Sequence, residues 1–250
     1  MGDPTKILIL GGTAEAAGLA RALFGDARVT TITSLAGRTR APAAVPGAVR
    51  VGGFGGPEAL ADYLKREGID LVVDATHPFA ARISRNAARA CNLAKVPRLL
   101  LARPPWTPQA GDNWVPVPDT EAAAAALADL GRRVFLAIGR QELAAFAGSA
   151  ELWFLVRLVE EPETPPPLAD HHLVLGRGPF AVEKEIDLLR EHGIEVVVSK
   201  NSGGAGAAAK IAAARALKLP VVMIERPPAP DSETAESMAA ARAWIDTRIS

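Results

Sequence analysis

The chain has 250 residues, of which 49% are hydrophobic and 22% are charged, a composition that is typical of a folded globular protein and excludes a disordered one. Its 28 basic and 28 acidic residues give a formal net charge of zero, whereas a general nucleic-acid binder usually has a pI above about 9. The one cysteine, Cys91, cannot form an internal disulfide, and no apolar run approaches the roughly 18 residues that span a bilayer. The first apolar run, residues 7–10, is too short for a signal-peptide core. We therefore expect a cytoplasmic protein that binds neither nucleic acid nor a membrane.

The first half of the chain alternates short apolar runs with amphipathic segments. The apolar runs are typical of strands in a buried parallel sheet, and they comprise residues 7–10, 29–34, 48–51, 71–75 and 98–101. Helices are predicted between them at residues 14–24, 58–67 and 80–93. This alternation predicts a doubly wound α/β domain over residues 1–112.

A proline-rich stretch at residues 103–119 has no periodicity and is predicted to connect two domains. After it, Thr120 is predicted to cap a helix at residues 121–130, and the alternation starts again. The expected strands are residues 134–138, 153–159, 173–175, 196–199 and 221–224, and the expected further helices are residues 141–147, 179–192, 207–217 and 233–247. The sequence therefore predicts an α/β protein of two Rossmann-like parallel-sheet domains, 1–112 and 113–250, with an interdomain cleft.

In open parallel sheets, ligands bind beyond the carboxyl ends of the strands. The first predicted strand is followed by GGTAEA, residues 11–16, which opens a helix. Glycines let the backbone approach a pyrophosphate, and a helix N-terminus favours its charge. The spacing departs from G-x-G-x-x-G, because Thr13 and Ala16 stand in two of the glycine places, so a plain strand-to-helix turn stays open as an alternative. The cofactor-binding residues predicted here are Gly11, Gly12, Thr13, Ala14 and Glu15.

The second predicted strand ends in TSLAGRTR, residues 33–40, which contains no carboxylate. A fold that prefers NADH places an acidic residue there to hold the ribose 2′-hydroxyl. Here the segment offers the hydroxyl of Ser34 and the guanidinium groups of Arg38 and Arg40, which suit a phosphate dianion. We therefore predict NADPH rather than NADH, with Ser34 and Arg38 as ligands. The alternative is that both arginines are solvated in a loop.

The fourth predicted strand ends in DATHPFA, residues 74–80, which we expect across the sheet from the phosphate loop, where a nicotinamide would lie. His77 is able to donate a hydrogen bond or a proton, because its charge changes near neutral pH. The alternative is a structural histidine at the start of the next helix. Thr76 and His77 are therefore candidates for the cofactor site, and His77 for catalysis.

In the second predicted domain, three strand ends carry a cation or a glycine-rich turn: GRQEL at residues 139–143, GRGPF at 176–180 and KNSGGAG at 200–206. Arg140, Arg177 and Lys200 converge if these strands are parallel, and Arg157 lies on an adjacent strand. Such convergence in a neutral protein indicates a polyanionic ligand. The alternative for each arginine is a helix cap or a pair with a nearby glutamate. Lys200 is suited to bind an anion or to act as a general acid.

Other chemistries have little support in the sequence. The four histidines show no helix-spaced metal pair, so no metal site is expected. No serine stands in a G-x-S-x-G turn, which argues against covalent hydrolase chemistry.

Taken in order, the strand-end segments resemble one family over residues 7–228, and this order is more specific than any single segment. The resemblance rests on ILILGGTAEA, TSLAGRT, DATHPFA, ISRNAARAC, RPPW, IGRQEL, WFLVR, GRGPF, SKNSGGAGAAAKIAAA and LPVVMIERPP. These segments are similar to those of the precorrin-6A reductase family of cobalamin (vitamin B12) biosynthesis.

The resemblance implies an NADPH-dependent oxidoreductase that acts on a CH–CH bond and reduces precorrin-6A to precorrin-6B by hydride transfer to the macrocycle. This tetrapyrrole carries acetate and propionate side chains, which agrees with a cationic site. The resemblance implies that the first domain holds NADPH and that Lys200 and His77 are the catalytic candidates. The substrate would be bound by Arg140, Arg177, Phe180, Lys200, Asn201, Ser202 and Gly203. Handover of the product to neighbouring pathway enzymes is a further expectation.

Three other functions stay open on the sequence alone. One is an NADP-dependent reductase of another polycarboxylate, with the same folds and a different pocket. Another is a non-catalytic protein whose two domains close on a small molecule, and the third is a nucleotide-sugar transferase. The segment at residues 33–40 argues against the non-catalytic protein, because it is suited to a phosphate.

Overall fold

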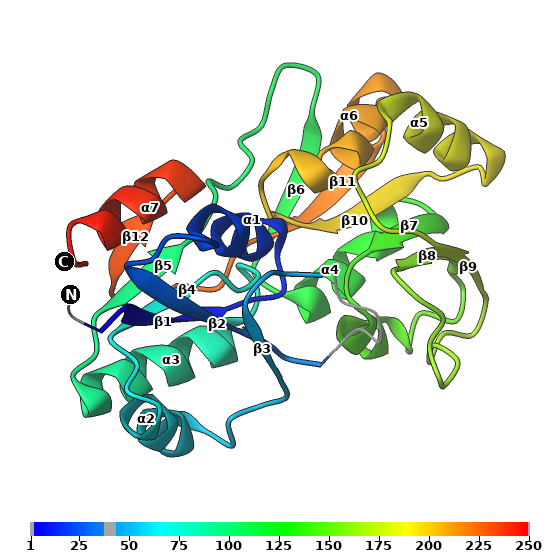
Figure 1. Ribbon diagram of the computed structural model, residues 1–250. Helices are drawn as coiled ribbons and strands as arrows, with labels where there is room; N and C mark the ends of the chain where they lie inside the picture. The colour runs from blue at the N-terminus through cyan, green and yellow to red at the C-terminus, as the bar shows by residue number, and fades with distance from the viewer. Residues whose placement is uncertain (1–2, 38–43, 250) are drawn as a thin grey trace. The chain divides into compact units, whose positions relative to one another are not determined.

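The computed structural model describes residues 3–37 and 44–249 (Figure 1). The chain forms two compact units. The first comprises Met1–Pro104 together with Pro227–Ser250, and the second comprises Pro105–Arg226. Each is an α/β unit built on one six-stranded parallel sheet, which confirms the predicted fold class.

The sheet of the first unit has the strand order β12-β5-β4-β1-β2-β3. Its strands are β1 (Thr5–Leu10), β2 (Val29–Leu35), β3 (Ala48–Val51), β4 (Leu71–Asp74), β5 (Arg98–Leu101) and β12 (Glu233–Ala235). Its helices are α1 (Ala14–Leu23), α2 (Pro57–Arg66), α3 (Ala81–Ala94) and α7 (Met238–Asp246). The strands and helices predicted in residues 1–102 are confirmed to within a few residues.

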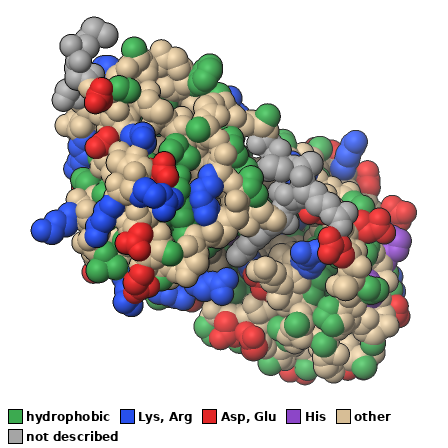
Figure 2. All heavy atoms as spheres, turned by 60° about the horizontal axis from the view of Figure 1, so that its bottom comes forward, with side chains coloured by type: hydrophobic (Ala, Val, Ile, Leu, Met, Phe, Trp, Pro, Cys, Tyr) green, Lys and Arg blue, Asp and Glu red, His purple; other side chains and the backbone are tan. Residues whose placement is uncertain are grey.

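Alternating residues of β1 face two separate cores. Ile7 and Ile9 pack with residues of α1 and α7, whereas Leu8 and Leu10 pack with residues of α2 and α3. Figure 1 shows these two helix pairs on opposite faces of the sheet. Because both faces are covered, the strand is apolar along its length, which is why an uninterrupted run predicted it. On the face drawn in Figure 2, basic and acidic side chains are mixed, in keeping with the balanced net charge.

The C-terminal segment belongs to the first unit, which differs from the predicted second domain of residues 113–250. Residues 233–235, predicted as the start of a helix, form β12, which pairs with β5. Ser237 then caps α7 by accepting a hydrogen bond from the backbone N–H of Ala240 at 3.2 Å. Ala241 and Ile245 on α7 are fully buried. A strand as short as β12 gives too little alternation to be recognised in the sequence.

The sheet of the second unit has the strand order β6-β11-β10-β7-β8-β9. Its strands are β6 (Asn113–Val117), β7 (Arg133–Ala137), β8 (Trp153–Leu158), β9 (His171–Leu175), β10 (Val196–Lys200) and β11 (Pro220–Ile224). Its helices are α4 (Thr120–Ala126), α5 (Val182–Glu191) and α6 (Ala209–Ala216), with 3-10 turns η1 (Leu127–Asp129), η2 (Arg140–Phe146) and η3 (Ala205–Ala207). Phe135 and Val197 pack with residues of α5 and α6 in its core.

Three local predictions in this unit differ from the structure. The stretch predicted as a connection contains β6, an edge strand, where Pro116 is tolerated because one side of the strand needs no partner. Asp119, not Thr120, caps α4, because its carboxylate accepts from the N–H of Ala122 at 2.8 Å. Residues 140–146 form a 3-10 rather than an α-helix.

Candidate functional site

The loop between β1 and α1 is fixed by hydrogen bonds to the neighbouring strand ends. The Thr13 hydroxyl donates to the carbonyl of Ala75 at 2.7 Å, and its oxygen accepts from the N–H of Ala16 at 3.1 Å. The N–H of Gly11 donates to the carbonyl of Ser34 at 2.8 Å. A Cβ at Gly11 would also lie 3.1 Å from a methyl carbon of Thr33. These hydrogen bonds and the close packing at Gly11 therefore hold the loop rigidly at the carboxyl edge of the sheet.

Gly12 has a φ of +109°, which favours glycine, and a Cβ there would meet nothing within 4 Å. The loop is therefore open above Gly12. The first-turn N–H groups of α1, which include those of Ala14 and Glu15, have no partner within the helix and favour an anion. This geometry can hold a pyrophosphate.

The Glu15 carboxylate, predicted beside the cofactor, forms an ion pair with Arg103. The Arg103 Nη1 to Glu15 Oε2 distance is 2.7 Å, and both side chains are no more than a quarter exposed. An unpaired carboxylate at this place would repel a phosphate, so Arg103 compensates for it.

The end of β2 carries buried hydroxyls. Thr33 and Ser34 are buried, and Ser34 Oγ lies 3.4 Å from Nη1 of Arg50 on β3. Arg38 and Arg40, on which the phosphate prediction depends, lie outside the described residues. Sequence reasoning missed Arg50, although its place one residue before the end of a strand and just before Gly52 and Gly53 was a usable signal.

The segment after β4 lies next to the phosphate loop, because β4 pairs directly with β1. The prediction that it lies across the sheet was wrong. Thr76, predicted near the nicotinamide, turns its hydroxyl inward and donates to Asp74 Oδ1 at 2.8 Å. Asp74 is fully buried, and its Oδ2 lies 3.5 Å from Nη1 of Arg98. This buried network fixes the start of the segment rather than offering Thr76 to a ligand.

His77 is exposed, and its Nδ1 accepts from the N–H of Phe79 at 3.3 Å. In the neutral ring the proton therefore lies on Nε2. A histidine held in this tautomer is suited to donate from Nε2 to a bound group. The structural role that the sequence left open is therefore supported, because the ring orders the segment before α3, and a catalytic role for His77 stays a prediction.

In the second unit, β10, β7, β8 and β9 lie side by side and parallel, so their carboxyl ends share one edge. A pocket of about 210 Å³ opens there. Its lining includes Arg157, Arg177, Phe180, Glu185 and Lys210. The structure thus brings together two of the predicted substrate residues, Arg177 and Phe180.

The sequence suggested that Arg157 contributes to a cationic ligand site, but its charge is paired within the protein. Its guanidinium donates to both oxygens of Glu185 at 2.7 Å each, and Glu185 is 1% exposed. The Phe180 ring centre lies 4.1 Å from its Cζ and the Phe135 ring centre 4.8 Å. This pair is neutral overall, and it supports the pocket wall by fixing the Phe180 ring.

Lys200 ends β10, and its Nζ lies 2.5 Å from Oε1 of Glu142. The lysine side chain is 14% exposed. The Glu142 carboxylate lies against the backbone of Gly139, just before η2, because a Cβ at Gly139 would lie 2.6 Å from its Oε2. The sequence left open that an arginine pairs with Glu142. In the structure, the cation that pairs with Glu142 is Lys200.

Asn201, predicted to bind substrate, is engaged by the backbone of Trp106. Its Oδ1 accepts from the Trp106 N–H at 2.8 Å, and its Nδ2 donates to the Trp106 carbonyl at 3.0 Å. Ser202 is buried, and Gly203 has a φ of +65°, which favours glycine. These three residues form a rigid turn after Lys200.

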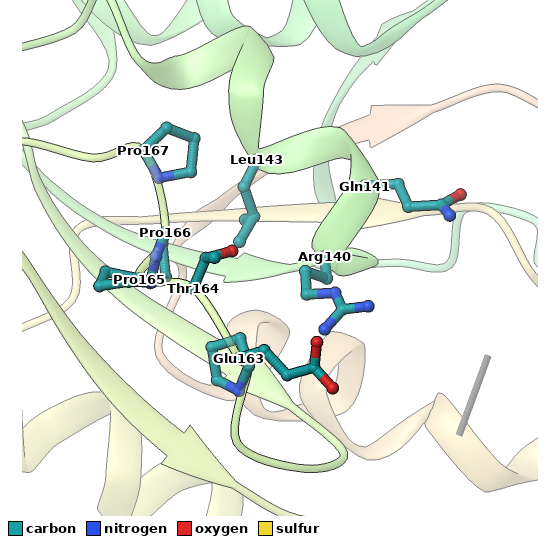
Figure 3. A pocket seen from close by; sticks show the side chains of 9 residues that line it. Arg140, Gln141, Leu143, Glu163, Thr164, Pro165, Pro166 and Pro167 are labelled. Carbon is teal, nitrogen blue, oxygen red and sulfur yellow. The ribbon is translucent and has the colours of Figure 1, made fainter. Parts of the chain in front are cut away.

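Arg140 lines a different pocket, of about 320 Å³, between η2 and the loop of residues 162–167. Figure 3 shows its guanidinium pointing toward the Glu163 carboxylate, with Gln141 pointing away. The prediction that Arg140, Arg177 and Lys200 converge is therefore not met within one pocket. The cations are spread over neighbouring strand ends of one sheet edge.

Within residues 3–37 and 44–249, no helix is long and apolar enough to cross a membrane. In the same part of the chain, no group of three or more His, Cys, Asp or Glu residues is placed to hold a metal ion.

Comparison with known proteins identifies the family. The model for "Precorrin-6x reductase CbiJ/CobK" matches residues 6–246. The chain belongs to this family. Members of the family are reductases, so the protein is an enzyme, as the resemblance implied.

The relatives match nearly the whole chain. A precorrin-6A reductase from Rhodococcus erythropolis is 50% identical over 244 residues, covering 97% of this chain and 98% of its own. One from Rhodobacter capsulatus is 49% identical over 241 residues, 96% of each chain. A cobalt-precorrin-6A reductase from Priestia megaterium is 30% identical over 236 residues, 88% of this chain and 90% of its own. A solved CobK precorrin-6A reductase has a TM-score of 0.92 at 48% identity and covers 97% of this chain and 96% of its own.

Proposed function

We propose that this reductase converts precorrin-6A to precorrin-6B in cobalamin biosynthesis, with NADPH as the hydride donor. The observation that carries the proposal is the identity of 47–50% to precorrin-6A reductases over nine-tenths or more of the chain. Three relatives named cobalt-precorrin-6A reductase are 28–30% identical. The metal-free macrocycle is therefore the proposed substrate.

The residues at the carboxyl edge of the first sheet fit a dinucleotide. The backbone of Gly11 and Gly12, the capping residue Thr13 and the first turn of α1 offer a rigid anion site that is open above Gly12. The proposed ligands of the 2′-phosphate are Ser34 and Arg38, since residues 33–40 contain no carboxylate. Bound there, NADPH supplies the hydride.

The pocket in the second unit is suited to part of an anionic ring system. Arg177 and Lys210 lie in its lining and are the proposed partners of acetate and propionate groups. The Phe180 ring, fixed by Arg157, offers an apolar face to the macrocycle. Arg140 and the turn of Lys200, Asn201, Ser202 and Gly203 lie at neighbouring strand ends and are proposed to contact the rest of the substrate.

The protein's contribution to the reaction is orientation and charge. Holding two reactants in a productive geometry can contribute roughly 7–11 kcal/mol to lowering the barrier. Lys200 and His77 are the proposed groups for the proton that accompanies the hydride. The Glu142 carboxylate keeps the Lys200 ammonium in place, so this cation is oriented before substrate binds.

The test uses the purified protein with metal-free precorrin-6A and follows nucleotide absorbance. We expect one NADPH oxidised for each macrocycle reduced, and slower oxidation of NADH. Oxidation with a simpler polycarboxylate but not with precorrin-6A would favour another reductase, and substrate binding without any oxidation would favour a non-catalytic binder. A preference for sugar nucleotides over NADPH would favour a transferase.

Two expectations from the sequence stay predictions. One is a cytoplasmic location, and the other is handover of the product to the next enzyme of the pathway. A pull-down with the neighbouring pathway enzymes, with and without precorrin-6B, would test the handover.

A further inference from the structure

Arg50 lies beside the expected binding site for the adenosine ribose of the proposed cofactor. It stands on the edge strand β3, and the strand register pairs it directly with Ser34 on β2. Ser34 also accepts the N–H of Gly11 through its carbonyl, so Arg50, Ser34 and the phosphate loop form one continuous edge. In dinucleotide-binding folds, the residues after β2 read the ribose 2′ position.

The Arg50 guanidinium is held in one orientation. Nη1 donates to the carbonyl of Gly52 at 2.5 Å, and Nη2 donates to the carbonyl of Gly53 at 2.7 Å. The Phe54 ring centre lies 3.8 Å from Cζ and covers one face of the guanidinium. Phe54 in turn packs edge-on against Tyr63, with ring centres 5.1 Å apart. The strand end and a small aromatic cluster therefore fix this cation before any ligand arrives.

The charge of Arg50 has no counter-ion in the described part of the chain. The groups near its guanidinium are two carbonyls, one hydroxyl and the aromatic rings of Phe54 and Tyr63, and none of them is a carboxylate. A guanidinium has five N–H donors, so donors remain for a further acceptor. An oriented and partly desolvated guanidinium without a carboxylate partner is suited to a phosphate oxygen.

We propose that Arg50, together with Ser34, binds the 2′-phosphate and so makes the protein prefer NADPH to NADH. This inference rests on the proposed function, because it assumes that a dinucleotide occupies the carboxyl edge of the first sheet. It makes Arg50 a determinant of specificity in addition to Arg38.

The experiment measures dissociation constants by calorimetry for two matched pairs of nucleotides: NADPH with NADH, and 2′,5′-ADP with 5′-AMP. The variant Arg50→Met removes the charge and keeps a linear apolar stem over Phe54. We expect affinity for NADPH and 2′,5′-ADP to fall about 10- to 100-fold, the range of a charge-assisted contact, and affinity for NADH and 5′-AMP to change less than about twofold. Arg50→Lys should recover part of the loss.

Arg66→Met is the matched control. Arg66 also lies near the Tyr63 ring, with Cζ at 5.4 Å, but it is two-thirds exposed on α2 and has no contact with Ser34. It should leave all four constants unchanged. Thermal melting of each variant verifies that the fold is kept.

Equal losses for phosphorylated and unphosphorylated nucleotides in Arg50→Met would overturn the inference, because they indicate stacking on adenine or a general role in the strand. No change in any constant would overturn it too. If the wild-type protein binds none of these nucleotides, the proposed function itself fails. If the wild-type protein and Arg50→Met prefer NADPH to NADH equally, only the inference about Arg50 fails.

Discussion

Lys200 at the end of β10 and Glu142 on η2 form an ion pair, although they lie 58 residues apart in the chain. Because the ammonium is mostly buried and already oriented, it can stabilise negative charge or give a proton without rearrangement. We predict that Lys200→Ala lowers the turnover number by about 100-fold, as for loss of a general acid, while the dissociation constant for NADPH changes less than about threefold. Steady-state kinetics with precorrin-6A, together with NADPH titration, checks this.

The control for that variant is Lys184→Ala, which removes an exposed lysine from α5. A second variant, Glu142→Gln, keeps a hydrogen-bond acceptor but removes the negative charge beside Lys200. It should lower turnover less than Lys200→Ala. An unchanged turnover number in Lys200→Ala would remove this residue from the catalytic candidates and leave His77.

Cys91 reports on the integrity of the first unit. It is 3% exposed in α3, and burial raises the pKa of its thiol to about 12. At pH 8 only ~1 thiol in 10⁴ is then ionised, and the thiolate is the reactive form. We predict that a thiol reagent modifies the native protein at least ~100-fold more slowly than the urea-unfolded protein. Equal rates in the two states would mean that α3 opens readily.

At the scale of elements, the segment after β9 and the 3-10 turn η3 approach each other closely. A Cβ at Gly178 would lie 2.6 Å from the carbonyl oxygen of Gly206, so only glycine fits there without movement. We predict that Gly178→Ala costs about 1–3 kcal/mol of stability, as for overpacking, and weakens substrate binding by moving Arg177 and Phe180. Urea unfolding and substrate titration measure the two effects.

Gly148→Ala is the matched control, because a Cβ at Gly148 would meet nothing within 4 Å and its φ is not positive. It should leave both stability and binding unchanged. If Gly178→Ala is as stable as the wild type and binds substrate equally well, the close approach of the two segments is not required.

Most elements that the sequence predicted well have both faces buried, although the exposed edge strand β3 was also predicted. The continuous apolar runs within β1 and β10 are typical of central strands, and the expected chemistry was placed at their carboxyl ends for that reason. The short edge strands β6 and β12 were missed, because they have few residues and are partly exposed. Their place depends on the partner strand, not on their own pattern.

The partners of the charged side chains were harder to predict than the strands. Two ion pairs, Lys200 with Glu142 and Arg157 with Glu185, join residues on different elements. The sequence does not show which of these elements are neighbours in the fold. Periodicity gives the direction of a residue on its own element and says nothing of which strands are neighbours. For the same reason the segment after β4 was expected across the sheet rather than beside the phosphate loop.

At the scale of the whole molecule, the first unit is built from two distant parts of the chain. The chain leaves this unit after Pro104 and returns at Pro227 to add β12 and α7. On return, α7 packs on α1 where Gly18 leaves room for the sulfur of Met238. The C-terminal segment therefore covers apolar surface of β1 and α1 that would otherwise be exposed, so the core of this unit needs β12 and α7.

An ion-pair network ties this returning helix to the turn after α1. Arg28 Nη2 lies 2.9 Å from Asp26 Oδ2 and 3.1 Å from Asp246 Oδ1, and Arg242 on α7 binds the same two carboxylates at 2.5 Å and 2.9 Å. Hydrogen bonds from Arg28 and then Arg242 hold the pKa of Asp26 well below its ordinary value. Those from Arg242 and Arg28 likewise lower the pKa of Asp246.

A carboxyl group whose pKa is lower in the folded than in the unfolded protein stabilises the fold above its unfolded pKa, about 3.9, and this contribution is lost as the pH falls below that value. We therefore predict that the melting temperature falls as the pH is lowered from 5 to 2, and that Asp26→Asn makes this fall shallower. Asp62→Asn, which changes an exposed residue of α2, is the control and should follow the wild type. Because the network joins α7 to the turn after α1, hydrogen exchange in the acid range should increase first in residues 238–246. Equal acid slopes in Asp26→Asn and the wild type would mean that the network does not secure the C-terminal segment.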